Sequence, residues 1–442
     1  MGIVHCSRSS RWLLAAALAL AAVGLPGAAW AQDQPPRPHY QGIFASAPPA
    51  SRELGVKWSA LGVYDDNVTA DTASFDPRLQ VNGLYWMGAA TLTYSENTKR
   101  HQFTANGRTT TRYYPDMSEL NATEGSGDVG LVAEIGRRSR VTLFQGATYQ
   151  PYYQMDFLGA TVPSEGVVVG DGSSVGPPQV GGTPLHTLTS YIYDGRYGWS
   201  TGIGRSGTLS TEYTYRRTIF DDGRQPFDWQ LADVKFTRKM TRYAALRLGY
   251  GYGYSQSTIR VENQNIDVGL DYARPLSRTR RTKINFSSGS SVINYLDKQY
   301  FVVNGDAGLT HEIGRSWTVN LDYHRGVQYA EAVAGPMMAD TVHTRFEGYL
   351  SRRIEANVHA AYSSGQIGLG STDPGYSTFS AGSALRIALN HVFSVDVQYL
   401  FDQYDFDHGA PVLVGIPRTL ERHSVRIGVT GWVPLLRSIA QR

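Results

Sequence analysis

The chain has 442 residues and a formal net charge of +3, and it contains 28 Tyr, 15 Phe, 8 Trp and 47 Gly. This near-neutral balance gives no basis for a nucleic-acid partner. A mean hydropathy of −0.30 argues against helices that span a membrane. The single cysteine, Cys6, lies in a segment that we expect to be removed, so no disulfide or thiolate chemistry is available to the mature chain.

Residues 1–31 have the features of a secretory signal peptide. Two arginines precede an uncharged run, 12–31, that ends on small residues, and we expect cleavage before Gln32. The alternative is a retained membrane anchor, which is less favoured because Pro26 interrupts the run and no basic flank follows it. Residues 32–53 are rich in proline and have no periodicity, which predicts an extended periplasmic lead-in rather than a domain.

From residue 54 onward, apolar or small residues alternate with polar ones. The clearest example is 101–113, where Phe103 and Ala105 fall on one face and Thr104 and Asn106 on the other. Only a closed barrel crosses a membrane with so low a mean hydropathy, since alternate residues face lipid and the rest face a polar lumen. We therefore predict an all-β, transmembrane antiparallel up-and-down β-barrel over 54–434, followed by a C-terminal tail, 435–442.

The alternation predicts about eighteen strands (16–18), an even number as bacterial barrels prefer. They are expected near 54–64, 84–94, 101–113, 128–135, 140–150, 188–200, 207–219, 227–237, 242–254, 264–273, 282–292, 301–313, 317–328, 341–350, 355–363, 378–388, 393–404 and 422–433.

Long connections alternate with tight turns along the chain. Basic residues such as Arg137 and Arg138 gather in the tight turns, whereas the long connections are acidic, as in Asp65-Asp66-Asn67. Short periplasmic turns and long extracellular loops are the rule in membrane barrels. The acidic clusters predict a solvated or lipopolysaccharide-bridging rim. Tyrosines where strands reach the long loops predict an interfacial girdle: Tyr113, Tyr114, Tyr149, Tyr152, Tyr153, Tyr254, Tyr329, Tyr362 and Tyr404.

Three motifs suggest chemistry and are better explained otherwise. Residues 202–207 match a dinucleotide fingerprint, but a strand follows instead of the helix that the motif requires. The histidines lack paired metal-ligand spacing, and the acidic clusters lack the spacing of a calcium loop. An exterior Ser-His hydrolase centred on His311 has no recognisable nucleophile elbow. We predict no enzyme activity, no catalytic, cofactor-binding or metal site, and no cofactor.

The segments Gly62-Val63-Tyr64-Asp65-Asp66-Asn67-Val68 and Ser424-Val425-Arg426-Ile427-Gly428-Val429 resemble the β-barrel porin 2 family of outer-membrane proteins. The resemblance spans about 54–434. It implies localisation in the cell outer membrane, contact with outer-membrane lipid and lipopolysaccharide, and a conduit for secreted exopolysaccharide that works with periplasmic or lipoprotein export components. The chain departs from the usual barrel pattern because residues continue beyond Pro434 instead of ending on an aromatic residue.

Parity along the strands predicts which charged residues face the lumen. They are either a track for a substrate or ionic networks across the wall, and the two interpretations stay open. We expect a channel that serves either as the export conduit or as a diffusion porin for small solutes. The candidates are Arg108, Arg112, Glu134, Glu212, Arg216, Arg247, Asp267, Asp271, Lys283, Asp306, Asp322, Arg386, Asp396, Asp402 and Arg426.

The longest connection, 151–187, combines apolar residues with many glycines, an odd composition for a loop exposed to water. We predict that it folds into the lumen as a constriction, and a surface loop is the alternative. The constriction candidates are Val167, Val168, Val169 and Asp171.

Overall fold

The computed structural model describes residues 50–68, 82–151, 153–155, 183–185, 189–221, 223, 225–256, 260–275, 281–295, 298–314, 316–329, 336–370, 373–410 and 418–439. All of them belong to one compact unit, His39–Arg442. The predicted signal peptide, 1–31, and the predicted extension as far as residue 49 lie outside the described residues.

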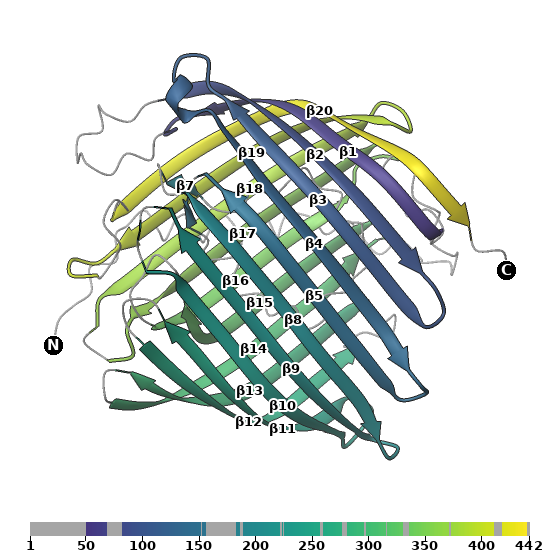
Figure 1. Ribbon diagram of the computed structural model, residues 1–442, viewed down its shortest axis with the longest axis vertical. Coiled ribbons are helices and arrows are strands. Elements are labelled where there is room, and N and C mark those ends of the chain that lie inside the picture. The colour runs from purple at the N-terminus through teal and green to yellow at the C-terminus, as the bar shows by residue number, and fades with distance from the viewer. Residues whose placement is uncertain are drawn as a thin grey trace. The chain divides into compact units, whose positions relative to one another are not determined.

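Eighteen strands form one sheet (Figure 1). Their number and antiparallel order confirm the predicted fold class. The strands are β1 (Ala50–Asp65), β2 (Gly83–Asn97), β3 (His101–Tyr113), β4 (Ala122–Ile135), β5 (Ser139–Gln150), β8 (Ser190–Ile203), β9 (Gly207–Phe220), β10 (Phe227–Lys239), β11 (Ala244–Gln256), β12 (Arg260–Pro275), β13 (Thr282–Tyr295), β14 (Lys298–Ile313), β15 (Trp317–Tyr329), β16 (Pro336–Tyr349), β17 (Ile354–Ile367), β18 (Gly375–Ala388), β19 (Phe393–Phe406) and β20 (Thr419–Ile439).

The sheet closes on itself because β1 pairs with β2 on one side and with β20 on the other. Every other strand pairs with its neighbours in sheet order, so the topology is up-and-down throughout. Closure leaves no strand edge with unpaired N–H and C=O groups, which is the condition for placing a sheet in lipid. A 3₁₀ turn, η2 (Ser118–Leu120), follows β3, and a separate two-stranded ladder joins β6 (Tyr153–Met155) to β7 (Thr183–Leu185).

Tight turns connect the strands at one end of the barrel. Gly136, Gly204 and Gly314 occupy such turns with φ of 75°, 66° and 65°, in the left-handed region that favours glycine. The three glycines allow the strands to reverse within a few residues. This is the end at which the sequence places basic residues.

Strands extend further into the predicted loops than alternation indicated. β4 begins at Ala122, inside the expected connection 114–127, and β16 begins at Pro336, inside 329–340. The first residues of β4, Thr-Glu-Gly-Ser, show no apolar alternation. Backbone pairing does not require that alternation, and so the strand continues through them.

The end of the barrel also differs from expectation. β20 continues to Ile439, through most of the predicted tail 435–442, and β1 begins before residue 54. Pro434 lies opposite Gly55 and Leu436 opposite Leu54, so one extra residue forms a β-bulge at this point. The bulge accommodates a proline that lacks an N–H, and pairing resumes beyond it.

Buried apolar side chains gather on the inner face near the end of β1 and the start of β2. This cluster comprises Leu61, Val63, Val68, Tyr85, Met87, Tyr114 and Leu120. Tyr114 was predicted to lie in the interfacial girdle, as was Tyr404, and both are buried instead. Tyr113, Tyr149 and Tyr362 are exposed as a girdle requires. Tyr114 follows directly after a strand, and Tyr404 has inward parity, so neither side chain faces the lipid.

Candidate functional site

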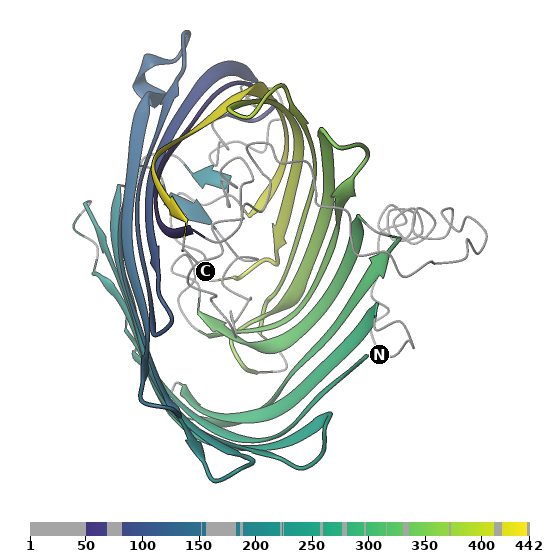
Figure 2. The ribbon, with the colours of Figure 1, turned by 90° about the vertical axis from the view of Figure 1, so that its right-hand side faces the viewer.

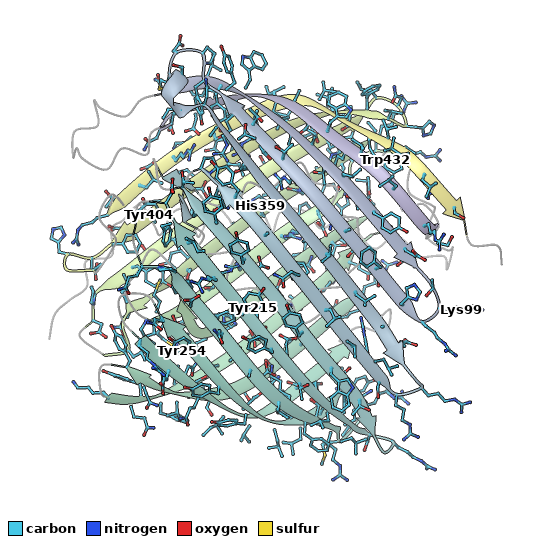
Figure 3. The ribbon with its side chains drawn as sticks, viewed as in Figure 1. Lys99, Tyr215, Tyr254, His359, Tyr404 and Trp432 are labelled. Carbon is cyan, nitrogen blue, oxygen red and sulfur yellow. The ribbon has the colours of Figure 1, made fainter. Side chains whose placement is uncertain are left out.

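One face of each barrel strand carries large exposed apolar side chains. Phe301, near the start of β14, is 69% exposed, and Val268, near the middle of β12, is 60% exposed. In Figure 3, Lys99 marks the tight-turn end of the barrel and Tyr404 lies toward the opposite end. Since successive side chains of a strand point to opposite faces, the remaining positions face inward. Among the residues that the structure describes, no helix is long and apolar enough to cross a membrane.

Every predicted lumen candidate occupies a position of inward parity on its strand. Arg112, Arg386, Asp396 and Arg426 are buried. Four others are exposed to the interior: Glu134, Arg216, Lys283 and Asp322. The remaining candidates are half-buried: Arg108, Glu212, Arg247, Asp267, Asp271, Asp306 and Asp402.

Two groups of these candidates form ion pairs with one another. Arg247 on β11 donates from Nε to Asp267 at 2.5 Å and from Nη1 to Asp271 at 2.6 Å, both on β12. Arg386 on β18 donates from Nε to Asp396 on β19 at 2.8 Å. These pairs join neighbouring strands, so they run along the wall. The geometry agrees with the interpretation as ionic networks, and it leaves the substrate track a prediction.

Arg247 also contributes to the wall itself. Regular pairing between β12 and β13 is interrupted between Ile266 and Tyr272. The Nη2 group of Arg247 donates to the backbone oxygen of Ser288 at 3.1 Å, within the stretch of β13 opposite this interruption. One guanidinium thus donates to two carboxylates and to a backbone acceptor at an irregularity in the wall.

The closure of the barrel contains the most deeply buried ion pair. Asp65 on β1 has no exposed surface, and Arg422 on β20 binds both of its carboxylate oxygens, from Nε at 2.9 and 2.8 Å and also from Nη2. Asp65 additionally accepts from the N–H of Asn67 at 3.0 Å. The prediction that Asp65 belongs to a solvated acidic rim was therefore wrong. Register explains the difference, because Asp65 lies opposite Ser424 and diagonally from Arg422.

Sequence reasoning missed further inward cations near this closure. Lys57 lies on the inner face of β1, and Arg422 on that of β20. Together with four predicted candidates they form what we call the basic arc. The basic arc comprises Arg386, Arg422, Arg426, Lys57, Arg108 and Arg112, on strands β18, β20, β1 and β3. Inward parity was a usable signal for Lys57 and Arg422, but the pairing of the first strand with the last was not available from the sequence.

A different set of charges lies on β14 and β15. Asp306 contacts His324 Nδ1 at 2.6 Å and accepts from the Ser287 hydroxyl at 2.8 Å. Asp322 lies opposite His343 on β16. This part of the wall therefore carries carboxylates and histidines, with Arg345 near Asp322, whereas the basic arc consists of five arginines and one lysine.

The histidines and acidic residues considered for metal binding and hydrolysis lie in the following surroundings. Within the described ranges, no group of three or more His, Cys, Asp or Glu side chains is arranged to hold a metal ion. His311 contacts the hydroxyl of Thr282 at 2.7 Å, on a neighbouring strand. That contact involves a threonine in regular sheet and gives the hydrolase interpretation no support.

The predicted constriction residues Val167, Val168, Val169 and Asp171 lie outside the described residues. The ends of their connection are described: β6 pairs with β7, with Tyr153 opposite Leu185. In Figure 2 these two short strands lie within the outline of the ring of barrel strands. The constriction itself remains a prediction.

Comparisons with known proteins give a likeness of fold. No family model matches the chain, and no curated protein matches it. Similar solved structures include Pseudomonas aeruginosa OpdQ, with 10% identity and a TM-score of 0.44, and Pseudomonas aeruginosa OccK2 (OpdF) in complex with glucuronate, with 10% identity and a TM-score of 0.45. Acinetobacter baumannii OccAB4 has 10% identity and a TM-score of 0.43. Each alignment covers 87% of this chain and 98% of the other. Likeness at this level assigns no family, and the resemblance to the β-barrel porin 2 family has no support from a family model.

Proposed function

We propose that the chain is an outer-membrane channel through which small solutes diffuse passively. The observation that carries the proposal is a closed barrel of eighteen strands whose inner face holds charged side chains of both signs. Barrels of about 16 to 18 strands are wide enough to leave an aqueous channel unless loops fill them. Charged side chains along that channel keep it wet and select among solutes by charge.

The outer surface supports the membrane part of the proposal. Outward positions on the strands hold exposed apolar and aromatic side chains, as in Leu246, Leu248, Tyr250 and Tyr252 on β11. Such a band is costly in water and favourable in lipid. The barrel strands, mostly 13 to 16 residues long as in β3 and β1, exceed the roughly 9–11 residues that a tilted strand needs to span a bilayer.

The export conduit rests on weaker ground. It followed from the family resemblance, and no family model or curated relative adds support to it. No contact among the described side chains favours a polysaccharide over a small solute. We therefore place passive diffusion first, and the export conduit becomes an outcome of the test.

Deleting the gene in its native bacterium separates the two functions. Passive diffusion predicts slower uptake of small hydrophilic solutes and an unchanged amount of secreted polysaccharide, both restored by the wild-type gene. Loss of secreted polysaccharide with normal uptake of solutes would overturn the proposal in favour of export.

A further inference from the structure

The inward face of β20 presents a column of polar side chains beside the barrel closure. Arg422, Ser424 and Arg426 alternate with outward residues, so their side chains follow one another along the same face. All three are buried, with Arg426 at 7% exposure. The column is therefore part of the wall of the lumen, and its groups need partners.

The three side chains differ in how they are satisfied. Arg422 binds Asp65 through both carboxylate oxygens. Within the part of the chain that the structure describes, Arg426 makes no ion pair, and neither its Nε nor the Ser424 hydroxyl has a hydrogen-bond partner. Buried polar groups are nearly always bonded, and buried charges are nearly always paired. Arg426 and Ser424 depart from both rules at adjacent inward positions.

Among the described residues, the carboxylates nearest to Arg426 are already paired with other arginines. Its nearest neighbours across the ladder are Val63 on β1 and Gln398 on β19. The carboxylates one step away are engaged elsewhere, because Asp65 binds Arg422 and Asp396 binds Arg386. Arg426 is repelled by the neighbouring cations Arg422 and Arg112, and the one carboxylate that attracts it, Asp65, is the partner of Arg422. Positive charge therefore accumulates here, and a water molecule would satisfy a hydrogen bond without balancing it.

We propose that Arg426 and Ser424 form a binding site for an oxyanion group: a carboxylate, phosphate or sulfate. The group accepts from Nε of Arg426 and from the hydroxyl of Ser424, and Arg422 and Arg112 add attraction at longer range. Val63 lies opposite Arg426 and Leu61 opposite Gly428, so these neighbours on β1 are apolar and offer the anion no competing carboxylate. The proposal rests on the proposed channel function, because a solute would come from the lumen, and binding requires the side chains that cover Arg426 Nε and Ser424 Oγ to move aside.

Binding is measured first on purified, folded protein in detergent. The temperature at which the unboiled gel mobility is lost is followed against phosphate, sulfate and acetate at constant ionic strength. Wild type is expected to gain thermal stability as the anion concentration rises. Arg426→Gln should need about tenfold or more anion to reach the same gain in thermal stability as wild type. Ser424→Ala should need a smaller increase, because the charge-assisted hydrogen bond from Arg426 is stronger than the hydrogen bond from the Ser424 hydroxyl.

Arg325→Gln is the matched control. Arg325 lies on the outward face of β15 and pairs with Asp340, and its side chain is 45% exposed. The same loss of one positive charge there should leave the dependence unchanged. Equal dependence in wild type and Arg426→Gln would overturn the site. Ser424→Ala keeps the test decisive if Arg426→Gln fails to fold, because an unchanged dependence in Ser424→Ala would overturn the site as well.

Conductance in planar bilayers distinguishes the source of the group. If carboxylated solutes reduce the current of wild type but not that of Arg426→Gln, the site binds solutes as they pass through the channel. Reduction by inorganic phosphate or sulfate alone supports a site for free anions. A folded protein that binds the anion but conducts no current supports the site and refutes the channel. If both proteins conduct and every anion changes the current of wild type and of Arg426→Gln by the same amount, the site is overturned and the channel stands.

Discussion

Replacing Asp65 by asparagine removes the negative charge from the ion pair that closes the barrel. Asparagine keeps the size of the side chain but offers one acceptor instead of two, and it removes the carboxylate that binds the buried Arg422, which keeps only the longer-range attraction of Asp402 on β19. Breaking a buried pair from one side costs about 3–5 kcal/mol. That corresponds to roughly a hundredfold to several thousandfold change in the ratio of folded to unfolded protein.

The assay is urea-induced unfolding of protein folded into lipid vesicles, with the folded fraction scored by unboiled gel mobility. The control is Asp340→Asn, which breaks the exposed pair with Arg325 and should cost at most about 1 kcal/mol. The double replacement Asp65→Leu with Arg422→Met should recover most of the loss, because it removes both charges together. A loss in Asp65→Asn no larger than in Asp340→Asn would refute the reasoning.

Three further replacements test other parts of the account. Val268→Lys places a charge on the lipid face near the middle of β12 and should destabilise the vesicle-embedded protein by roughly 2–4 kcal/mol, and a variant as stable as wild type would argue against lipid at that face. Gly428→Ala should cost about 1–3 kcal/mol because its Cβ would lie 2.1 Å from the Ala60 oxygen, whereas Gly88→Ala has open space and should be nearly neutral in the same titration. Arg247→Gln leaves two lumen carboxylates uncompensated, so the reversal potential across a salt gradient should shift toward cation selectivity, and a shift toward anions would contradict a water-filled lumen.

The strands were predictable from the sequence because alternation is a local property. In 101–113 the predicted and observed strand coincide, and the inward parity of Arg108 and Arg112 follows from it. Strand ends were less predictable. The start of β4 at Ala122 depends on backbone pairing with β3, and the residues there show no alternation that would reveal it.

Partners across the barrel closure were not predictable, because they depend on register between segments at opposite ends of the chain. Asp65 and Arg422 are separated by most of the sequence, and only the pairing of β1 with β20 brings them together. The same limit applies to the unpaired state of Arg426. Parity places its side chain inward, but whether a carboxylate lies within reach is decided by the register of β1 and β19.

Single-channel recording of the purified, folded protein in planar bilayers distinguishes an open channel from an occluded barrel. The account predicts discrete current steps in potassium chloride from protein that migrates as the folded form, and no steps from the same sample after boiling. Folded protein that inserts into the bilayer and passes no current would contradict an open diffusion channel.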